Sequence, residues 1–343
     1  MRAAVLPGYA SALEIHDLPV PEPGPGQVLV RVAGVGLCHS DLHLSTGALP
    51  MLPSMPWVLG HEISGYVEAY GPAAGGSAGA PTLTGPLEHG TPVAVFGGWG
   101  CGTCTVCLSG DEQLCSVASW VGIGRPGGFA EYVLVPAVRH LVPLGDLDPI
   151  TSAPLTDAAL TPYRAVKKAL PNLVPGTTVV VIGAGGLGQY AVQLLRELSS
   201  ARLVVVEADA GRCAVATELG ADLAIVPDEV DDAGLAGAAA AVIDLVGSDP
   251  TLALAGRLAA PRARVVIVGL GGGSLATGFL SPAAEVLVGS SFWGNRTELA
   301  EVVALAQSGR LTTRVHEVDL AGAEHAMRDL EAGKVDGRIV LVP

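Results

Sequence analysis

Aromatic side chains are scarce in this chain of 343 residues, at 4% of the sequence, and lysine occurs only at Lys167, Lys168 and Lys334. Since half of the residues are hydrophobic, the core must be built from Val, Leu, Ile and Ala. With 19 basic and 33 acidic residues, the formal net charge is −14. The chain therefore lacks the basic surface that follows a phosphate backbone, and we expect no nucleic-acid partner.

The sequence also lacks a run that suits a membrane-spanning helix. The segment Val265–Ala284 is uncharged, but its glycines and Pro282 are unsuited to a span of about 20 apolar residues. It predicts a buried strand followed by a loop. The first ten residues have too short an apolar run for a secretory signal. We expect a cytoplasmic protein without a membrane partner.

Two kinds of pattern follow each other along the chain. The first half is rich in turns, with short strands predicted at Val28–Val35 and Thr91–Phe96 and a surface loop over Gly71–Gly90. After about Thr156, apolar strands alternate with helical patterns, which predicts an α/β fold with a doubly wound parallel sheet. The expected strands are Thr178–Ile182, Leu203–Val206, Val242–Val246, Val265–Val268 and Arg338–Val342, and the expected helices are Leu187–Ser199, Arg212–Leu219 and Glu298–Gly309.

A glycine-rich turn joins the first of these strands to the next helix. Gly183, Gly185 and Gly188 have the spacing of the dinucleotide-binding turn, with Gly186 and Leu187 opening the helix. Glu207 ends the following strand, where an acid meets the ribose 2′-hydroxyl and repels a 2′-phosphate. This context favours NAD over NADP as the cofactor.

Four cysteines lie in one short segment, at Cys101, Cys104, Cys107 and Cys115. Four thiolates so close together indicate a closed, tetrahedral structural zinc site with no open position for a substrate. An iron–sulfur cluster is the alternative, but the seven residues before the last cysteine and the absence of a proline after it fit that pattern poorly.

Further polar residues stand in apolar surroundings and suit a catalytic metal, which needs about three protein ligands and one open position. Cys38 and His61 are candidate ligands, and either Glu62 or Asp157 could be the third. Taken one at a time, each of these residues is ordinary, so the residues alone leave a shared metal site open.

Six motifs together resemble the medium-chain zinc alcohol dehydrogenases, especially bacterial NAD-dependent members that act on secondary alcohols. They are GLCHSD, GHE, the four-cysteine segment, PLTDAALTPY, VIGAGGLG and WGNRTEL, and they extend over nearly the whole chain. The resemblance implies a β-rich GroES-like catalytic domain over 1–157 and 295–343 and a Rossmann domain over 158–294. It also implies a homodimer or homotetramer.

The resemblance further implies a role for individual residues. Cys38, His61 and Asp157 would bind the catalytic zinc, with Glu62 as a nearby carboxylate that contacts the metal transiently and Asp41 orienting the ring of His61. Ser40 would bind the alcohol oxygen and pass its proton to His43. The implied cofactor contacts beyond the glycine turn and Glu207 are His39 and Arg296 at the pyrophosphate and Arg212 at the adenosine ribose.

The scarce aromatic residues Trp293, Phe292 and Trp57 are candidates for an apolar pocket that takes a small alcohol or ketone. The expected reaction is reversible hydride transfer between the alcohol and NAD. Two alternatives remain, a related zinc-dependent polyol or aldehyde reductase and a protein that binds NAD and zinc without turnover. Double-bond reductases of this superfamily generally lack the catalytic zinc residues, so Cys38, His61 and Asp157 count against them.

Overall fold

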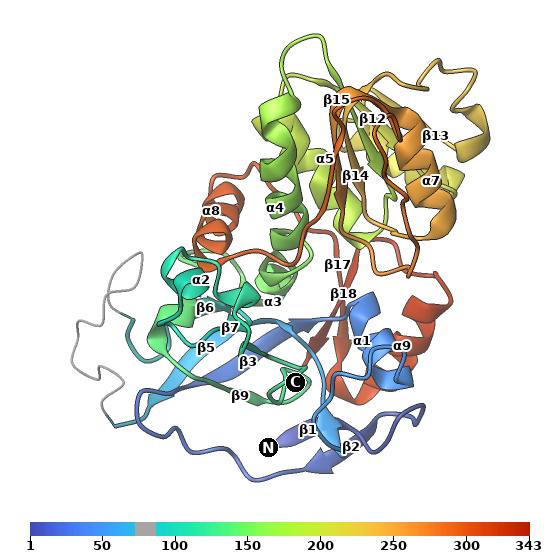
Figure 1. Cartoon of the computed structure of the whole chain (residues 1–343). Helices are drawn as coiled ribbons and strands as arrows, with labels where there is room; N and C mark the ends of the chain where they lie inside the picture. Colours follow the sequence, from blue (N-terminus) through green and yellow to red (C-terminus); the bar gives the residue numbers. More distant parts are fainter. Residues whose placement is uncertain (73–86) are drawn as a thin grey trace. The chain divides into compact units, whose positions relative to one another are not determined.

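The computed structural model describes residues 1–72 and 87–343, and the chain divides into two compact units (Figure 1). The first unit comprises Met1–Leu160 and Gly294–Pro343, and the second comprises Thr161–Trp293. Most of the surface loop predicted over Gly71–Gly90 lies outside the described residues.

The second unit is built on six parallel strands, as the alternating pattern predicts. Their order across the sheet is β13-β12-β11-β14-β15-β16, in which the chain moves outward from β11 in one direction and then restarts beside it in the other. This is the doubly wound order in which a ligand binds beyond the carboxyl ends of the two central strands. The strands are β11 (Thr178–Ile182), β12 (Arg202–Val206), β13 (Leu223–Ile225), β14 (Ala239–Asp244), β15 (Ala259–Ile267) and β16 (Leu287–Ser290).

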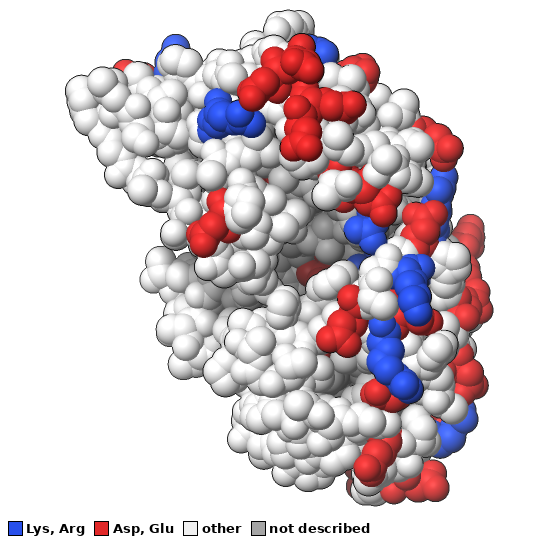
Figure 2. Space-filling view, turned by 90° about the vertical axis from the view of Figure 1, so that its right-hand side faces the viewer, with Lys and Arg blue, Asp and Glu red and all other residues white. Residues whose placement is uncertain are grey.

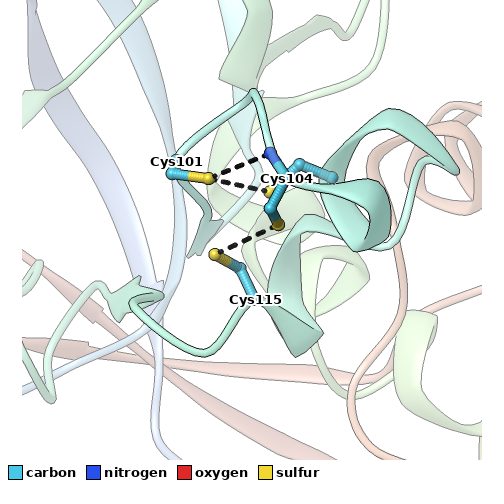
Figure 3. A group of neighbouring side chains, drawn as sticks. Cys101, Cys104 and Cys115 are labelled. Atoms are coloured by element: carbon cyan, nitrogen blue, oxygen red, sulfur yellow. Dashed lines mark hydrogen bonds between the residues drawn. The ribbon is translucent and has the colours of Figure 1, made fainter.

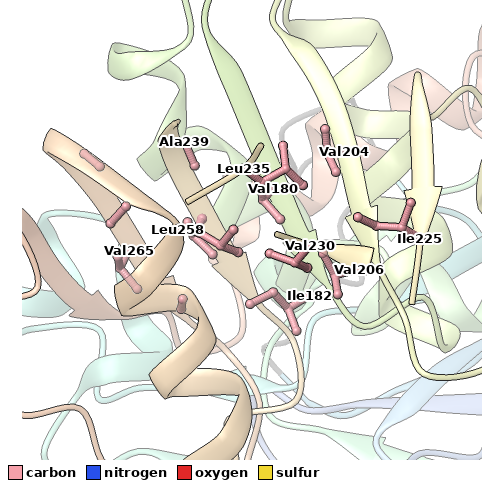
Figure 4. Close-up of a cluster of buried hydrophobic side chains, with 14 residues drawn as sticks. Val180, Ile182, Val204, Val206, Ile225, Val230, Leu235, Ala239, Leu258 and Val265 are labelled. Atoms are coloured by element: carbon pink, nitrogen blue, oxygen red, sulfur yellow. The ribbon is translucent and has the colours of Figure 1, made fainter. Parts of the chain in front are cut away.

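Helices cover this sheet and enclose an aliphatic core. Val180 and Leu258 belong to a buried cluster that extends to Val265 on one side and to Ile225 on the other (Figure 4). The central strands are buried along nearly their whole length, which is why they are near-continuous runs of valine. The helices are α4 (Leu160–Ala169), which begins in the first unit, α5 (Gly186–Leu198), α6 (Ala210–Glu218) and α7 (Asp249–Leu258), with 3₁₀ turns η4 (Leu170–Asn172) and η5 (Pro227–Glu229).

The first unit is β-rich and mainly antiparallel. Over the residues described there, its largest sheet has the order β10-β6-β5-β3-β18-β17, with β9 also paired to β3. A second sheet has the order β2-β1-β4, and β7 pairs with β8. The strands are β1 (Arg2–Leu6), β2 (Glu14–Asp17), β3 (Val28–Gly36), β4 (Trp57–Val58), β5 (Glu62–Tyr70), β6 (Pro92–Val95), β7 (Gly98–Trp99), β8 (Ser119–Trp120), β9 (Tyr132–Val135), β10 (Leu141–Pro143), β17 (Val315–Asp319) and β18 (Arg338–Val342).

Short helices connect these strands and position the polar residues. The helices are α1 (His39–Thr46), α2 (Thr105–Leu108), α3 (Pro149–Ser152), α8 (Arg296–Gln307) and α9 (Ala323–Glu331), and the 3₁₀ turns are η1 (Glu112–Leu114), η2 (Val138–His140), η3 (Ala153–Thr156) and η6 (Leu320–Gly322). The strand β18 pairs with β3 antiparallel and with β17 in parallel, so it lies inside the sheet between these two strands.

The predicted elements are confirmed, with shifts at their ends. The strand expected over Val242–Val246 ends at Asp244, because the Asp244 carboxylate accepts hydrogen bonds from the N–H groups of Val246 and Gly247 and turns the chain. The uncharged run Val265–Ala284 is the end of β15 followed by a loop, as predicted. The edge strand β16 was not predicted, since its four residues carry no alternating pattern.

The surface in Figure 2 carries acidic side chains scattered among a smaller number of Lys and Arg residues, in keeping with the net charge of −14. Among the helices of the described residues, none is long and apolar enough to cross a bilayer.

Candidate active site

Cys38 stands at the junction between β3 and α1 in the first unit. It is the N-cap residue of α1, and its backbone N–H donates to the Asp41 carboxylate at 3.0 Å. Asp41 is the third residue of the helix, so its carboxylate reaches back to the cap in the manner of a capping box. The backbone of Cys38 is therefore fixed by a fully buried carboxylate, and the thiol itself is largely buried.

The second oxygen of Asp41 orients the ring of His61. Asp41 Oδ1 lies 3.2 Å from His61 Nδ1 and also accepts a hydrogen bond from the N–H of Gly60 at 3.3 Å. A carboxylate at Nδ1 holds the proton there and leaves Nε2 with a lone pair for a metal ion. His61 directly precedes β5, so the sheet fixes its backbone.

Asp157 brings a carboxylate to the same point from the end of η3. Its Oδ2 lies 3.7 Å from Cys38 Sγ and 3.5 Å from His61 Nε2. Two ligands of one tetrahedral zinc ion, bound at about 2.0–2.3 Å, lie about 3.3–3.8 Å apart. The separations therefore fit three ligands of a single zinc ion. With Glu62, the four residues each offer one donor atom within 4.8 Å of the others.

Glu62 is paired with a buried arginine. Its Oε1 accepts a hydrogen bond from the guanidinium of Arg338, the first residue of β18, and both side chains are buried. Its Oε2 is buried and finds no hydrogen-bond partner among the described residues. A buried carboxylate oxygen of this kind is expected to face a cation.

The electrostatics of the cluster also favour a bound cation. Burial lowers the pKa of His61, but the carboxylates of Asp41 and Asp157 outweigh it and raise the pKa well above the usual value. Burial raises the pKa of Glu62 to about 7 against the opposing charge of Arg338. The carboxylates of Asp41 and Asp157 therefore stabilise positive charge on the imidazole, and the sulfur, nitrogen and oxygen donors of Cys38, His61 and Asp157 suit a zinc ion.

Three polar residues on α1 lie beside the cluster. Ser40 Oγ is 3.2 Å from His61 Nε2, so the hydroxyl is next to the candidate metal position. His43 follows one turn later on the same helix, half-buried, and no direct side-chain hydrogen bond joins it to Ser40 in the part of the chain described. His39 is exposed at the start of the helix.

The four clustered cysteines form a second donor set in the lobe between β7 and β8, called here the cysteine lobe (residues 101–115). Cys101 Sγ lies 3.8 Å from Cys107 Sγ, and Cys104 Sγ lies 3.8 Å from Cys115 Sγ. Figure 3 shows the side chains of Cys101, Cys104 and Cys115 turned toward one another. The edge of a tetrahedron with zinc–sulfur bonds of about 2.3 Å is about 3.8 Å, so the thiols are spaced for one zinc ion and are too far apart for disulfides.

The glycine turn of the second unit has the geometry that a dinucleotide site needs. Gly183 has a φ of +96°, and a Cβ on Gly188 would come 2.9 Å from the carbonyl carbon of Gly183. A Cβ on Gly185 would meet open space, so the missing side chain leaves the backbone accessible to a phosphate. Gly186 and Leu187 form the first turn of α5. The three glycines thus supply the tight turn, the open backbone and the close packing that such a turn requires.

Glu207 links the glycine turn to the turn that begins α6. Its carboxylate accepts hydrogen bonds from the N–H of Ala184 at 2.6 Å and from the N–H of Asp209 at 3.0 Å. Asp209 in turn caps α6 by accepting from the N–H of Arg212. A carboxylate has about four acceptor positions, so Glu207 retains capacity for a ribose hydroxyl.

The aromatic pocket candidates belong to different units, Trp57 to the first and the neighbouring Phe292 and Trp293 to the second. Trp57 and Trp99 line a cavity of about 480 Å³ in the first unit, and Cys38, His61 and Asp157 are not among its lining residues. In the second unit, Trp293 is buried and Phe292 is exposed. Arg338 was missed by sequence reasoning, although a buried glutamate at position 62 implies a buried cation.

Known proteins resemble this chain over its whole length. Residues 24–146 match the family model "Alcohol dehydrogenase GroES-like domain" and residues 186–308 match "Zinc-binding dehydrogenase". An NAD-dependent alcohol dehydrogenase of Sulfurisphaera tokodaii is 36% identical over the full length of both chains. A D-arabinose 1-dehydrogenase (NADP(+)) of Saccharolobus solfataricus is 33% identical, covering 100% of this chain and 97% of the relative. The solved alcohol dehydrogenase of Aeropyrum pernix is 35% identical, with full coverage of both chains and a TM-score of 0.90.

Proposed function

Since this chain belongs to the GroES-like, zinc-binding alcohol dehydrogenases, we propose that it oxidises a small secondary alcohol to a ketone at Cys38, His61 and Asp157. The chain is an NAD-dependent alcohol dehydrogenase, and its cofactors are NAD and zinc. The observation that carries the site assignment is the set of donor separations around Asp157 Oδ2, at 3.5 and 3.7 Å.

Asp157 is preferred to Glu62 as the third zinc ligand on geometric grounds. Asp157 lies within ligand–ligand distance of both Cys38 and His61. The carboxylate of Glu62 is instead engaged by Arg338. Glu62 would then be a nearby carboxylate available for transient contact with a bound metal ion. In the same proposal the first unit is the catalytic zinc-binding domain and the second is the dinucleotide-binding domain.

The residues on α1 supply proton transfer. When bound, zinc supplies Lewis acidity toward the substrate oxygen, and NAD supplies a hydride acceptor. Ser40, beside His61 Nε2, accepts the hydroxyl proton of the alcohol and passes it outward toward His43. Imidazole suits the outer position because it exchanges protons with solvent near neutral pH. Asp41 keeps the ring of His61 in one orientation throughout.

The proposed cofactor contacts start at the glycine turn. Gly183, Gly185 and Gly188 allow the pyrophosphate to approach the start of α5, and Glu207 binds the adenosine ribose, with Arg212 nearby on α6. His39 and Arg296 contribute positive or hydrogen-bonding groups to the pyrophosphate. Trp293, Phe292 and Trp57 remain the proposed apolar walls for the substrate.

Substrate preference is tested by NAD reduction with propan-2-ol and ethanol side by side, with D-arabinose as a third arm. One additional methyl group in an apolar pocket is worth about 1–3 kcal/mol, so kcat/KM should favour propan-2-ol at least about tenfold. Equal or better turnover of ethanol would contradict the secondary-alcohol assignment. Turnover of D-arabinose but of neither alcohol would identify the substrate as a sugar and contradict the proposal.

We propose that the chain assembles as a homodimer or homotetramer through the edge of the second unit's sheet. Strand β16 is the last strand of that sheet, and Leu287 on it is 59% exposed. Phe279 and Leu280 in the preceding loop are also exposed, Phe279 to 95%. An exposed edge with apolar side chains is stabilised by pairing with another chain. Light scattering should give about twice or four times the mass of one chain, and the mass of a single chain would refute the assembly.

We assign the protein to the cytoplasm. Its cysteines are all free, and four of them are spaced for a metal, which requires the reduced state of that compartment. Fractionation of cells that produce the protein provides the test, and recovery outside the cytoplasmic fraction would reject the assignment.

A further inference from the structure

Two carboxylates in the stretch between Cys107 and Cys115 form hydrogen bonds with residues outside the cysteine lobe. Asp111 precedes the turn η1 and Glu112 begins it. Asp111 accepts a hydrogen bond from Asn295, the N-cap of α8, which lies far away in the sequence but in the same unit. Glu112 accepts hydrogen bonds from Arg139, whose carbonyl oxygen in turn accepts one from Arg296 on α8. The lobe is thus joined to the helix that carries Arg296.

The first connection uses both ends of one amide side chain. Asn295 Nδ2 donates to Asp111 Oδ1 at 3.2 Å, across 184 residues of sequence. Asn295 Oδ1 meanwhile accepts from the N–H of Glu298 at 2.8 Å and caps α8, while Glu298 Oε2 accepts from the N–H of Asn295 at 2.8 Å. Asn295 therefore fixes the first turn of α8 and ties it to the lobe with the same side chain.

The second connection runs through Arg139. Glu112 accepts two hydrogen bonds from the Arg139 guanidinium, each at 3.3 Å, and a third bond joins it to His140. Burial would raise the pKa of Glu112, but His140 and Arg139 outweigh it and lower the pKa to about 2, so the carboxylate stays charged. The carbonyl oxygen of Arg139 accepts a hydrogen bond from Arg296 Nη1 at 3.2 Å. Through Arg139, the cysteine lobe therefore also restrains the guanidinium of Arg296.

The residue before this cap is also fixed. A Cβ on Gly294 would come 2.6 Å from Leu160 Cγ, so Gly294 packs directly on the residue three positions beyond Asp157. The segment 294–296 therefore has little freedom between Leu160 on one side and the cysteine lobe on the other.

We propose that Asp111 is a positioning residue for cofactor binding: through Asn295 it sets the first turn of α8 and so aims Arg296 at the pyrophosphate of NAD. The cysteine lobe, in addition to bracing its own loop, thereby raises the affinity of the enzyme for NAD. This inference rests on the proposed function in one respect, the contact between Arg296 and the pyrophosphate.

Exchanging the carboxylate of Asp111 and the amide of Asn295 distinguishes an effect on NAD binding from a loss of protein stability. Asn295→Asp keeps an equally good helix cap but removes the amide donor and sets two carboxylates against each other. In zinc-loaded enzyme, titration calorimetry with NAD should show a dissociation constant raised at least about fivefold, with kcat changed less than about twofold. The double variant Asp111→Asn with Asn295→Asp restores the hydrogen bond in the opposite sense, because the amide donor now stands on the lobe and the carboxylate acceptor on the helix cap. It should return the dissociation constant to within about twofold of the original.

The controls make either outcome decisive. Asp146→Asn removes one carboxylate, as Asp111→Asn does in the double variant, but from an exposed position of the same unit, and it should leave NAD affinity unchanged. Unchanged affinity in Asn295→Asp, or a double variant no better than Asn295→Asp, overturns the positioning role. Arg296→Gln tests the contact between Arg296 and the pyrophosphate apart from the positioning role of Asp111. If it leaves NAD affinity unchanged, the pyrophosphate contact fails and the inference fails with it. If it weakens binding while Asn295→Asp does not, only the positioning role is rejected.

Discussion

Replacing Cys38 with serine should lower kcat/KM at least about a thousandfold, while the dissociation constant for NAD stays within about twofold of the original value. A serine hydroxyl is neutral and a poor zinc ligand, so only His61 and Asp157 would remain of the three ligands proposed for the catalytic zinc. Zinc lowers the pKa of water from about 15.7 to about 7, and loss of comparable acidification accounts for the size of the effect. The glycine turn lies in the other unit and keeps its own contacts.

Cys213→Ser is the matched control for this experiment. Cys213 is 8% exposed and Cys38 is 7% exposed, so both substitutions put the same hydroxyl into a similarly buried position. The control should retain turnover, because Cys213 lies on α6 and not in either cluster of candidate metal ligands. Activity in Cys38→Ser equal to that of Cys213→Ser would remove Cys38 from the mechanism.

The second large effect concerns cofactor choice. Glu207→Ser should lower the ratio of kcat/KM for NAD to that for NADP by about 30- to 150-fold. A carboxylate about 4 Å from a phosphate charge costs about 4 kcal/mol in a partly screened environment, and solvent at the site reduces this to about 2–3 kcal/mol. The same change removes an acceptor of the Ala184 N–H, so the melting temperature should fall as well.

Glu207→Gln separates charge from hydrogen bonding. The amide oxygen still accepts from the N–H of Ala184, so the glycine turn keeps its partner, while the charge is lost. Most of the change in cofactor ratio should therefore appear in this variant too. If the ratio of kcat/KM for NAD to that for NADP is unchanged in both variants, Glu207 supports the glycine turn and does not discriminate between the two cofactors at the ribose.

The nucleotide half could be predicted closely because its signals are local. A run of valine, a glycine turn and a helical repeat follow each other within 178–199, and neither tertiary contacts nor distant residues are needed to read them. The strand ends were less predictable, because the turn at Asp244 depends on its side chain bonding to its own backbone. Such a competing hydrogen bond leaves no mark in hydrophobic periodicity.

The metal cluster was predictable only in part for the opposite reason. Cys38 and His61 are linked through Asp41, three residues from one and twenty from the other. The residues alone made both candidate ligands, and only the family resemblance implied a shared zinc site. The residues alone left Glu62 and Asp157 open as the third ligand, and the resemblance implied Asp157. The ion pair that engages Glu62 is with Arg338, which lies 276 residues away in the sequence. The bond between Asp111 and Asn295 spans 184 residues. Contacts between residues so far apart in the sequence form only when the chain folds, so they cannot be predicted from composition or motif spacing.

Zinc content tests the central claim, that one chain carries a catalytic zinc site beside the zinc of the cysteine lobe. Metal analysis of purified wild-type protein and of Cys38→Ser would count the two sites separately. We predict about two zinc ions per chain in the wild type and about one in Cys38→Ser, with turnover lost alongside the second ion. About one zinc ion in both proteins, or full turnover in the variant with a single ion, would contradict the account.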